Sequence, residues 1–117
     1  MNEANSLLKG GLSAIILALL SSKGRMYGYE ICQHVKEVTS GQMRITEGAL
    51  YPALHRLEGE GLLISQLEIV DGRPRKYYAI APDQKENAVN HLSRIQDFIT
   101  QLQVVLSPEK LTDLQIT

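Results

Sequence analysis

The most telling deficit of this sequence is the lack of excess positive charge. Twelve Lys and Arg residues face thirteen Asp and Glu residues, so the formal net charge at pH 7 is -1 and the sequence pI is about 6.3. Proteins that attract nucleic acid through their overall charge are strongly basic, and this composition gives that mode of binding no support. Any nucleic-acid surface must therefore come from the local placement of a few cations.

Thiol chemistry is almost absent. Cys32 is the only cysteine, which excludes an intrachain disulfide and a metal site with two or more thiolates. This usage is compatible with a reducing compartment, and we expect a cytoplasmic protein. Because no further ligand-type residues stand near Cys32 and His34 at metal spacing, we expect Cys32 in the core, His34 on the surface, and neither metal nor cofactor.

No apolar run is long enough to cross a membrane. The longest uncharged stretch covers residues 10–22, whereas a helical span needs roughly 20 residues. A signal peptide is the alternative, because Lys9 precedes this stretch and Ser21 and Ser22 follow it. We favour a core helix, since cleavage would remove an element that a single small domain with 44% hydrophobic residues needs.

Linear motifs of catalysis are also missing. The histidines at 34, 55 and 91 fall on three different predicted helices, and the chain has no nucleophile–base pattern and no Gly-rich phosphate loop. We therefore expect a protein that is not an enzyme.

The clearest pattern is helical and covers residues 46–63, TEGALYPALHRLEGEGLL. Leu50, Leu54 and Leu57 recur at i, i+4 and i+7, which is the spacing of one buried stripe. The hydroxyl of Thr46 can accept a hydrogen bond from an unpaired N–H group of the first turn. We predict a helix that begins after Thr46 and ends at the glycines 59 and 61.

The face opposite these leucines is polar and small. Helical projection places Gly48, Pro52 and His55 there, with Tyr51 and Arg56 on the flanks. A phenol, an imidazole and a guanidinium beside small residues suit a nucleic-acid groove. Pro52 inside a helix costs about 3 kcal/mol, because it lacks an N–H and crowds the carbonyl of Gly48, whose backbone is freer to adjust.

A shorter helix is predicted ahead of this one. After a turn at residues 23–26, residues 27–38 place Ile31 and Val35 at helical spacing, and a loop at residues 39–45 leads into the next helix. Two helices joined by a short connection, the second with a polar outer face, form a helix-turn-helix pattern.

A two-stranded hairpin is predicted next. Residues 62–70 favour a strand, residues 71–74 (DGRP) a turn, and residues 75–80 (RKYYAI) a returning strand. The densest group of cations lies at its tip and on its second strand: Arg73, Arg75 and Lys76. Behind a helix-turn-helix, this hairpin is predicted to be a wing along a phosphate backbone, and a solvated hairpin tip is the alternative.

The first and last predicted helices carry more apolar surface than one small domain can cover. They span residues 5–22 and 83–106, and Asp83 with Glu86 resembles a capping box at the start of the second. We expect both to pair with a second subunit, and packing of the last helix on its own domain is the alternative. The stripes are Leu8, Leu12, Ile15 and Leu19, widened by Leu7, Ile16 and Leu20, and a heptad seam of Ala88, Leu92, Ile95, Ile99, Leu102 and Leu106.

Three motifs carry a resemblance to a known family. YGYEI at 27–31, GALYPALHRLEGEGLL at 48–63 and GRPRKYY at 72–78 stand in the order and spacing of the PadR family of bacterial transcriptional regulators, which the chain resembles over about residues 7–106. The resemblance implies a mainly α fold with a small β-hairpin, in which residues 1–82 form a winged helix-turn-helix domain (wing about 62–80). Residues 83–117 would form a dimerisation helix and tail, as in short members, and the dimer would repress transcription.

The patterns and the resemblance together predict two sets of functional residues. By the resemblance, Tyr51 and its neighbours would enter the major groove, and the wing cations would hold the flanking backbone. The predicted DNA contacts are Tyr27, Thr46, Gly48, Ala49, Tyr51, Pro52, His55, Arg56, Arg73, Arg75 and Lys76. The predicted dimer contacts are Leu8, Leu12, Ile15, Leu92, Ile95, Ile99, Leu102 and Leu106.

A ligand and a protein partner are two further possibilities that the sequence raises. Some short members of the family bind flat hydrophobic compounds between the terminal helices, so the resemblance allows for a small hydrophobic ligand between subunits. The chain has no Trp and Phe98 is its only Phe, which argues against an aromatic sandwich around such a ligand. A winged-helix module that binds another protein, without specific DNA binding, is the alternative that the net charge favours.

Overall fold

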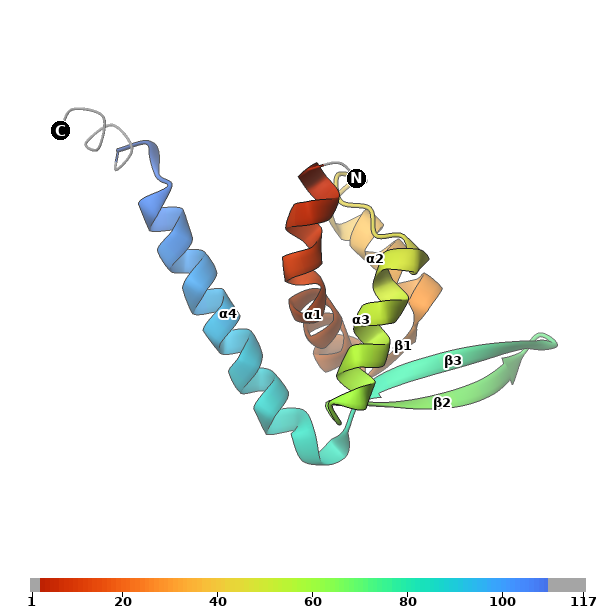
Figure 1. The fold of residues 1–117 in the computed structure, drawn as a ribbon. Coiled ribbons are helices and arrows are strands. Elements are labelled where there is room, and N and C mark those ends of the chain that lie inside the picture. Colours follow the sequence, from red (N-terminus) through yellow and green to blue (C-terminus); the bar gives the residue numbers. More distant parts are fainter. Residues whose placement is uncertain (1–2, 110–117) are drawn as a thin grey trace.

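The computed structural model describes residues 3–109, with side chains from Gly11 onward. Within this part, four helices and a single-turn 3-10 helix accompany a three-stranded sheet (Figure 1). The predicted fold class, mainly α with a small β-hairpin in a winged helix-turn-helix, is confirmed. In chain order the elements are α1 (Glu3–Lys23), β1 (Arg25–Tyr27), α2 (Gly28–Val38), α3 (Glu47–Gly59), β2 (Leu63–Val70), β3 (Arg73–Ile80), η1 (Pro82–Gln84) and α4 (Lys85–Val105).

The core lies where α1, α2 and α3 meet the base of the sheet. The leucine stripe predicted for α3 is buried, with at most 3% of Leu50, Leu54 and Leu57 exposed. Fully buried partners come from the other elements: Ile16 and Leu17 of α1, Met26 of β1, Ile31 of α2, Leu63 of β2 and Tyr78 of β3. This packing confirms the helix-turn-helix and explains why a short chain can hold three helices and a sheet together.

The side of α1 that faces the core includes a residue that the predicted stripe left out. Ile16 and Leu17 are fully buried, whereas Ile15 and Leu19 are only partly buried. Leu17 was missed because this helix is apolar around most of its circumference. The spacing of its apolar residues therefore does not indicate which single face is buried. The side chain of Leu8 lies outside the described part of the chain.

The sheet has a strand that the sequence analysis missed. Residues 23–26 were predicted as a turn, but Arg25–Tyr27 forms β1 and pairs antiparallel with β3, in the strand order β1-β3-β2. Only Gly24, with φ +90°, makes the sharp bend. Three residues are too few to show the alternation that marks a strand, so only the partner strand reveals this one.

The hairpin turn is tighter than predicted. Val70 pairs with Arg73, so the turn holds only Asp71 and Gly72, both with positive φ (+52° and +77°). These angles belong to the type I′ turn, whose twist matches that of the strands. Arg73 and Pro74 therefore belong to β3. Pro74 is tolerated because β1 pairs only with Tyr77–Ala79, which leaves that edge of β3 open beside the proline.

Both ends of α3 follow the prediction. The Thr46 hydroxyl accepts a hydrogen bond from the Ala49 N–H at 3.2 Å. At the other end Gly61 adopts φ +85°, and the N–H groups of Gly61 and Leu62 donate to the carbonyls of Glu58 and Leu57, both at 3.0 Å. This pair of bonds is the Schellman motif, which ends the helix firmly at the predicted glycines.

The start of α4 differs from the prediction. Pro82 opens the 3-10 turn η1, and neither η1 nor α4 has a side-chain cap. The capping box of Asp83 and Glu86 is therefore wrong. Proline has the φ of a first helical position, so the helical turn begins ahead of Asp83 and leaves it inside the turn.

α4 departs from the body soon after it begins. Ala88 is its only buried residue and Leu92 packs partly on the core, after which α4 projects to the side of the body opposite the wing (Figure 1). Among residues 3–109, no helix combines the length and the hydrophobicity that a bilayer crossing requires.

Candidate nucleic-acid interface

The outer face of α3 is open to solvent as predicted. Gly48, Ala49, Pro52 and His55 are all exposed, on the side of α3 away from its buried leucines. A Cβ added to Gly48 would meet only the Thr46 hydroxyl, 4.0 Å away. No bulky side chain stands over Gly48, so another molecule can come close to the backbone of the first turn of α3.

Tyr51 links this face to the start of α2. Its ring is half-buried and lies over Gly28, where an added Cβ would stand 2.6 Å from the phenol oxygen. The phenol donates a hydrogen bond to Glu47 Oε1 at 3.4 Å. Burial, followed by the nearby Glu47 carboxylate, raises the pKa of Tyr51, so the phenol remains neutral and can donate or accept a hydrogen bond.

Cys32 lies in the core beneath this corner. Burial, and then the Glu47 carboxylate, raises the pKa of its thiol, which keeps it protonated and unreactive. His34 is partly exposed. In the described part of the chain, no group of three or more His, Cys, Asp or Glu residues could hold a metal ion.

Arg56 points toward α1. Its Nη2 donates to Ser13 Oγ at 2.7 Å, and its Nε lies 3.8 Å from Glu60 Oε1. Ser13 lies on α1, and Glu60 follows the last turn of α3. A DNA contact by Arg56, as predicted, would require it to leave Ser13.

The three wing cations do not form one patch. Successive residues of a strand point to opposite faces of the sheet, so Arg75 and Lys76 are separated. Lys76 Nζ lies 3.7 Å from Glu58 Oε1 at the end of α3, and the Ser65 hydroxyl donates to the same carboxylate. The guanidinium of Arg75 lies instead over the ring of Tyr27, 4.7 Å from its centroid. The predicted cluster is thus divided between the two faces.

Four side chains form an aromatic–arginine layer on the face that carries Arg75. Its members are Arg25, Tyr27, Arg75 and Tyr77. The two tyrosine rings meet edge to face at 5.4 Å, and Arg25 lies 4.2 Å above the ring of Tyr77. A hydrogen bond to Tyr77 raises the pKa of the Arg75 guanidinium. Sequence reasoning missed Arg25 and Tyr77 because only β1 brings them together.

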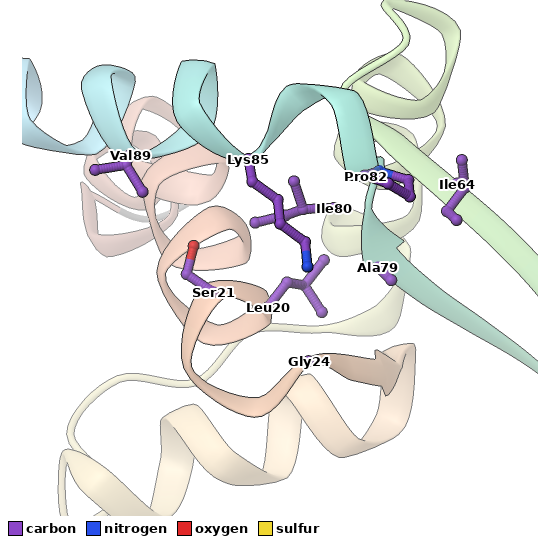
Figure 2. A pocket seen from close by; sticks show the side chains of 9 residues that line it. All are labelled: Leu20, Ser21, Gly24, Ile64, Ala79, Ile80, Pro82, Lys85 and Val89. Atoms are coloured by element: carbon purple, nitrogen blue, oxygen red, sulfur yellow. The ribbon is translucent and has the colours of Figure 1, made fainter.

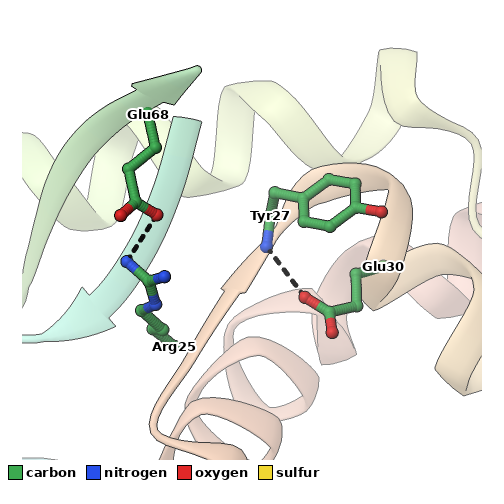
Figure 3. A network of polar contacts seen from close by, with 4 residues as sticks. All are labelled: Arg25, Tyr27, Glu30 and Glu68. Carbon is green, nitrogen blue, oxygen red and sulfur yellow. Dashed lines mark hydrogen bonds and ion pairs between the residues drawn. The ribbon is translucent and has the colours of Figure 1, made fainter. Parts of the chain in front are cut away.

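Two polar contacts fix the edges of this layer (Figure 3). Arg25 Nη1 lies 2.7 Å from Glu68 Oε2 on β2, so the Arg25 side chain reaches across β3. The backbone N–H of Tyr27 donates to Glu30 Oε1 at 3.3 Å, which ties the last residue of β1 to the first turn of α2. The wing and the start of α2 are thereby held against each other.

A cavity of about 350 Å³ lies where the end of α1, the base of the sheet and the start of α4 meet. Its walls are mainly apolar and include Leu20, Ile80 and Val89. The side chain of Lys85 reaches down toward Leu20 with its ammonium group (Figure 2). The lining of the cavity is thus mainly apolar and includes one positively charged ammonium group.

The projecting half of α4 leaves apolar side chains uncovered. Phe98 is 61% exposed, Ile99 47% and Leu102 41%. Lone chains rarely leave so continuous an apolar stripe in water. Leu12, which was predicted as a subunit contact, is only 5% exposed and lies in the core of its own chain, so it has little surface to offer a partner.

An exposed polar helix after a short connection, flanked by a β-hairpin with cations on it, defines the winged helix-turn-helix class. Residues 16–88, more than half of the chain, match the family described as the transcriptional regulator PadR-like family. The chain belongs to this family, and it is a transcriptional regulator rather than an enzyme.

Known relatives agree with this assignment. The transcriptional regulator Rv3488 of Mycobacterium tuberculosis is 47% identical over 47 residues, which cover 40% of this chain and 44% of that protein. The chain thus matches less than half the length of that regulator. A transcriptional regulator from Clostridium thermocellum has a similar structure, with a TM-score of 0.74, 27% identity, and coverage of 87% of this chain and 99% of that one. A PadR family regulator from Eggerthella lenta aligns with a TM-score of 0.66 and 26% identity, over 88% of each chain.

The contact between Tyr51 and Gly28 can be tested by Gly28→Ala. The added methyl group must displace the Tyr51 ring, so we expect the free energy of unfolding to fall by about 1 kcal/mol, measured by urea denaturation at fixed protein concentration. In a Tyr51→Leu background the same change should be neutral or stabilising. Gly11→Ala is the matched control, because a Cβ there meets nothing within 4 Å, and it should stabilise by up to about 1 kcal/mol. Equal gains from both glycine substitutions would contradict the close contact.

Proposed function

We propose that this chain is a dimeric, sequence-specific DNA-binding repressor that recognises an inverted repeat. The observation that carries the proposal is a continuous surface from α3 to the wing. Tyr51 of α3 covers Gly28, which directly follows Tyr27 in the chain. Arg75 of the wing lies on the ring of Tyr27. Base-reading groups and a phosphate-binding cation are thus joined on one side of the molecule.

The residues divide into two roles in this proposal. Gly48, Ala49, Pro52 and His55 face base edges, and Tyr51 lies at the rim of the groove. Thr46 and the free N–H groups at the start of α3 approach a phosphate, because the positive end of a helix dipole attracts anions. Arg73, Arg75 and Tyr27 contact the flanking backbone. Lys76 lies on the opposite face of the wing and would act at longer range, and Arg56 would join only after release from Ser13.

Dimerisation is assigned to the uncovered stripe of α4. The proposed contacts on and just after α4 are Leu92, Ile95, Ile99, Leu102 and Leu106. Ile15 of α1 joins them, and Leu8 is added from the sequence pattern. Residues 1–82 would then bind DNA, and residues 83–117 would join the subunits. Two recognition helices related by a two-fold axis fit half-sites about one helical turn, ~34 Å, apart.

Regulation by a small hydrophobic ligand is a further part of the proposal, and the cavity at the base of α4 supports it. A ligand there would contact both α1 and α4, so it could change the direction in which α4 leaves the body. The fluorescent probe 1-anilinonaphthalene-8-sulfonate tests this idea. We expect it to release bound DNA in a gel shift, and Val89→Arg to prevent the release. Full DNA occupancy at saturating probe would contradict a ligand at this cavity.

A winged-helix module that binds another protein is the competing function, favoured by the net charge of -1. It predicts weak binding to every DNA sequence. A footprint on the DNA upstream of the chain's own gene separates the two functions, because a repressor of this class would protect a defined inverted repeat there.

Substitutions at Arg75 and His55 test the division of roles on that repeat. Arg75→Ala should weaken binding to every sequence similarly and lower the slope of log K against log salt by about 1, because one phosphate contact is lost. His55→Ala should instead change base preference with little effect on the slope. Lys36→Ala, which removes one charge from the far end of α2, is the control. An unchanged affinity and slope for Arg75→Ala would contradict the proposed contact.

Substitutions on α4 test the subunit contact. Ile99→Glu and Leu102→Glu place a charge on the uncovered stripe, so we expect each to weaken dimerisation at least 10-fold, measured by sedimentation equilibrium. Gln101→Glu adds the same charge on the other side of α4 and should leave the dimer intact. A native chain that sediments as a monomer at micromolar concentration would refute this assignment.

A further inference from the structure

A carboxylate borders the aromatic–arginine layer, and its ion-pair partner is not the residue directly opposite it in the sheet. Glu68 on β2 stands directly opposite Arg75 on β3. Opposed residues of an antiparallel pair have Cβ atoms about 4.5–5.5 Å apart, and oppositely charged side chains there form ion pairs. Glu68 nevertheless pairs with Arg25, two strands away, at 2.7 Å.

Arg25 is held in this crossing position by two contacts. Its guanidinium lies over the ring of Tyr77, 4.2 Å from the ring centroid, while its Nη1 reaches Glu68. Arg75 is held separately, over the ring of Tyr27 and against Tyr77. The two tyrosines thus provide one position for each arginine, and only Arg25 reaches the carboxylate. In the described part of the chain Arg75 makes no ion pair.

We propose that Arg25 is a positioning residue for the wing: by occupying Glu68, it leaves Arg75 free to bind a DNA phosphate. Without Arg25, Glu68 would turn to Arg75 and neutralise it. This inference rests on the proposed DNA contact of Arg75 and gives a structural reason why Arg75 is free to make that contact.

Through this crossing contact a chain with net charge -1 can present a free arginine. Glu68 is the only acidic residue on either strand of the hairpin. One cation outside the hairpin, from the strand that precedes α2, is enough to neutralise it. The same crossing contact joins β1 to β2 over β3, so the wing keeps its angle to α2 while Arg75 stays unpaired.

Three variants of the full chain test the proposal on the protected DNA repeat. Arg25→Met keeps the apolar stem over Tyr77 but removes the charge. We expect it to weaken DNA binding about 2–5-fold per subunit, the range for one exposed ion pair, and to lower the salt slope as Arg75→Ala does. Glu68→Gln added to Arg25→Met should restore both affinity and slope. Arg25→Lys should stay near the parent protein, because Lys can still pair with Glu68.

The outcomes separate this inference from the underlying function. If Arg25 itself contacts DNA, Glu68→Gln will fail to restore binding to Arg25→Met, and the positioning role is overturned. If Arg25→Met only damages the fold, urea denaturation will show a loss of stability that Glu68→Gln does not reverse, which also overturns it. If Arg75→Ala leaves DNA binding unchanged, the proposed function of the wing fails first, whatever the Arg25 variants do.

Discussion

The three residue pairs between β1 and β3 are the constraint on which the arrangement of the molecule depends. They place Tyr27 opposite Tyr77 and so bring the start of α2 against the wing. From this junction, Gly28 receives the ring of Tyr51 on α3. The position of α3 relative to the wing is therefore fixed from two sides: by this short strand, which joins α2 to the wing, and by Lys76 and Ser65 of the wing, which contact Glu58 at the end of α3.

Local placement of charge compensates for the absence of a basic composition. Each wing cation near the body has its own neighbour: Lys76 meets Glu58 and Arg75 meets an aromatic ring. An aromatic ring holds a guanidinium through its electron-rich face without cancelling the charge. Tyrosine is the commonest aromatic residue of the chain, with five copies against one Phe and no Trp. Two of these five lie in the layer that carries the arginines.

Local patterns predicted much of the fold and the outer face of α3. The spacing of three leucines and the hydroxyl of Thr46 located α3, because a helix repeats within a few residues and its caps are chemically distinct. β1 could not be found in this way, since three residues carry no period. The neighbouring cations Arg75 and Lys76 look like one patch in the sequence, and only the pleat of β3 shows that they diverge. The pairing of Arg25 with Glu68 needs the strand order, which no local pattern contains.

The form of α4 has a consequence for the life of a newly made chain. Beyond Leu92 this helix touches little of its own body, while Phe98 and Ile99 stay open to water. A helix is stabilised mainly by packing, so the outer turns of α4 depend on whatever covers them. At low copy number a solitary polypeptide would therefore fray at this end and become a substrate for proteases. With the proposed subunit contact, the cell would keep the regulator only when enough copies are made at once, which would set a lower limit on its working abundance.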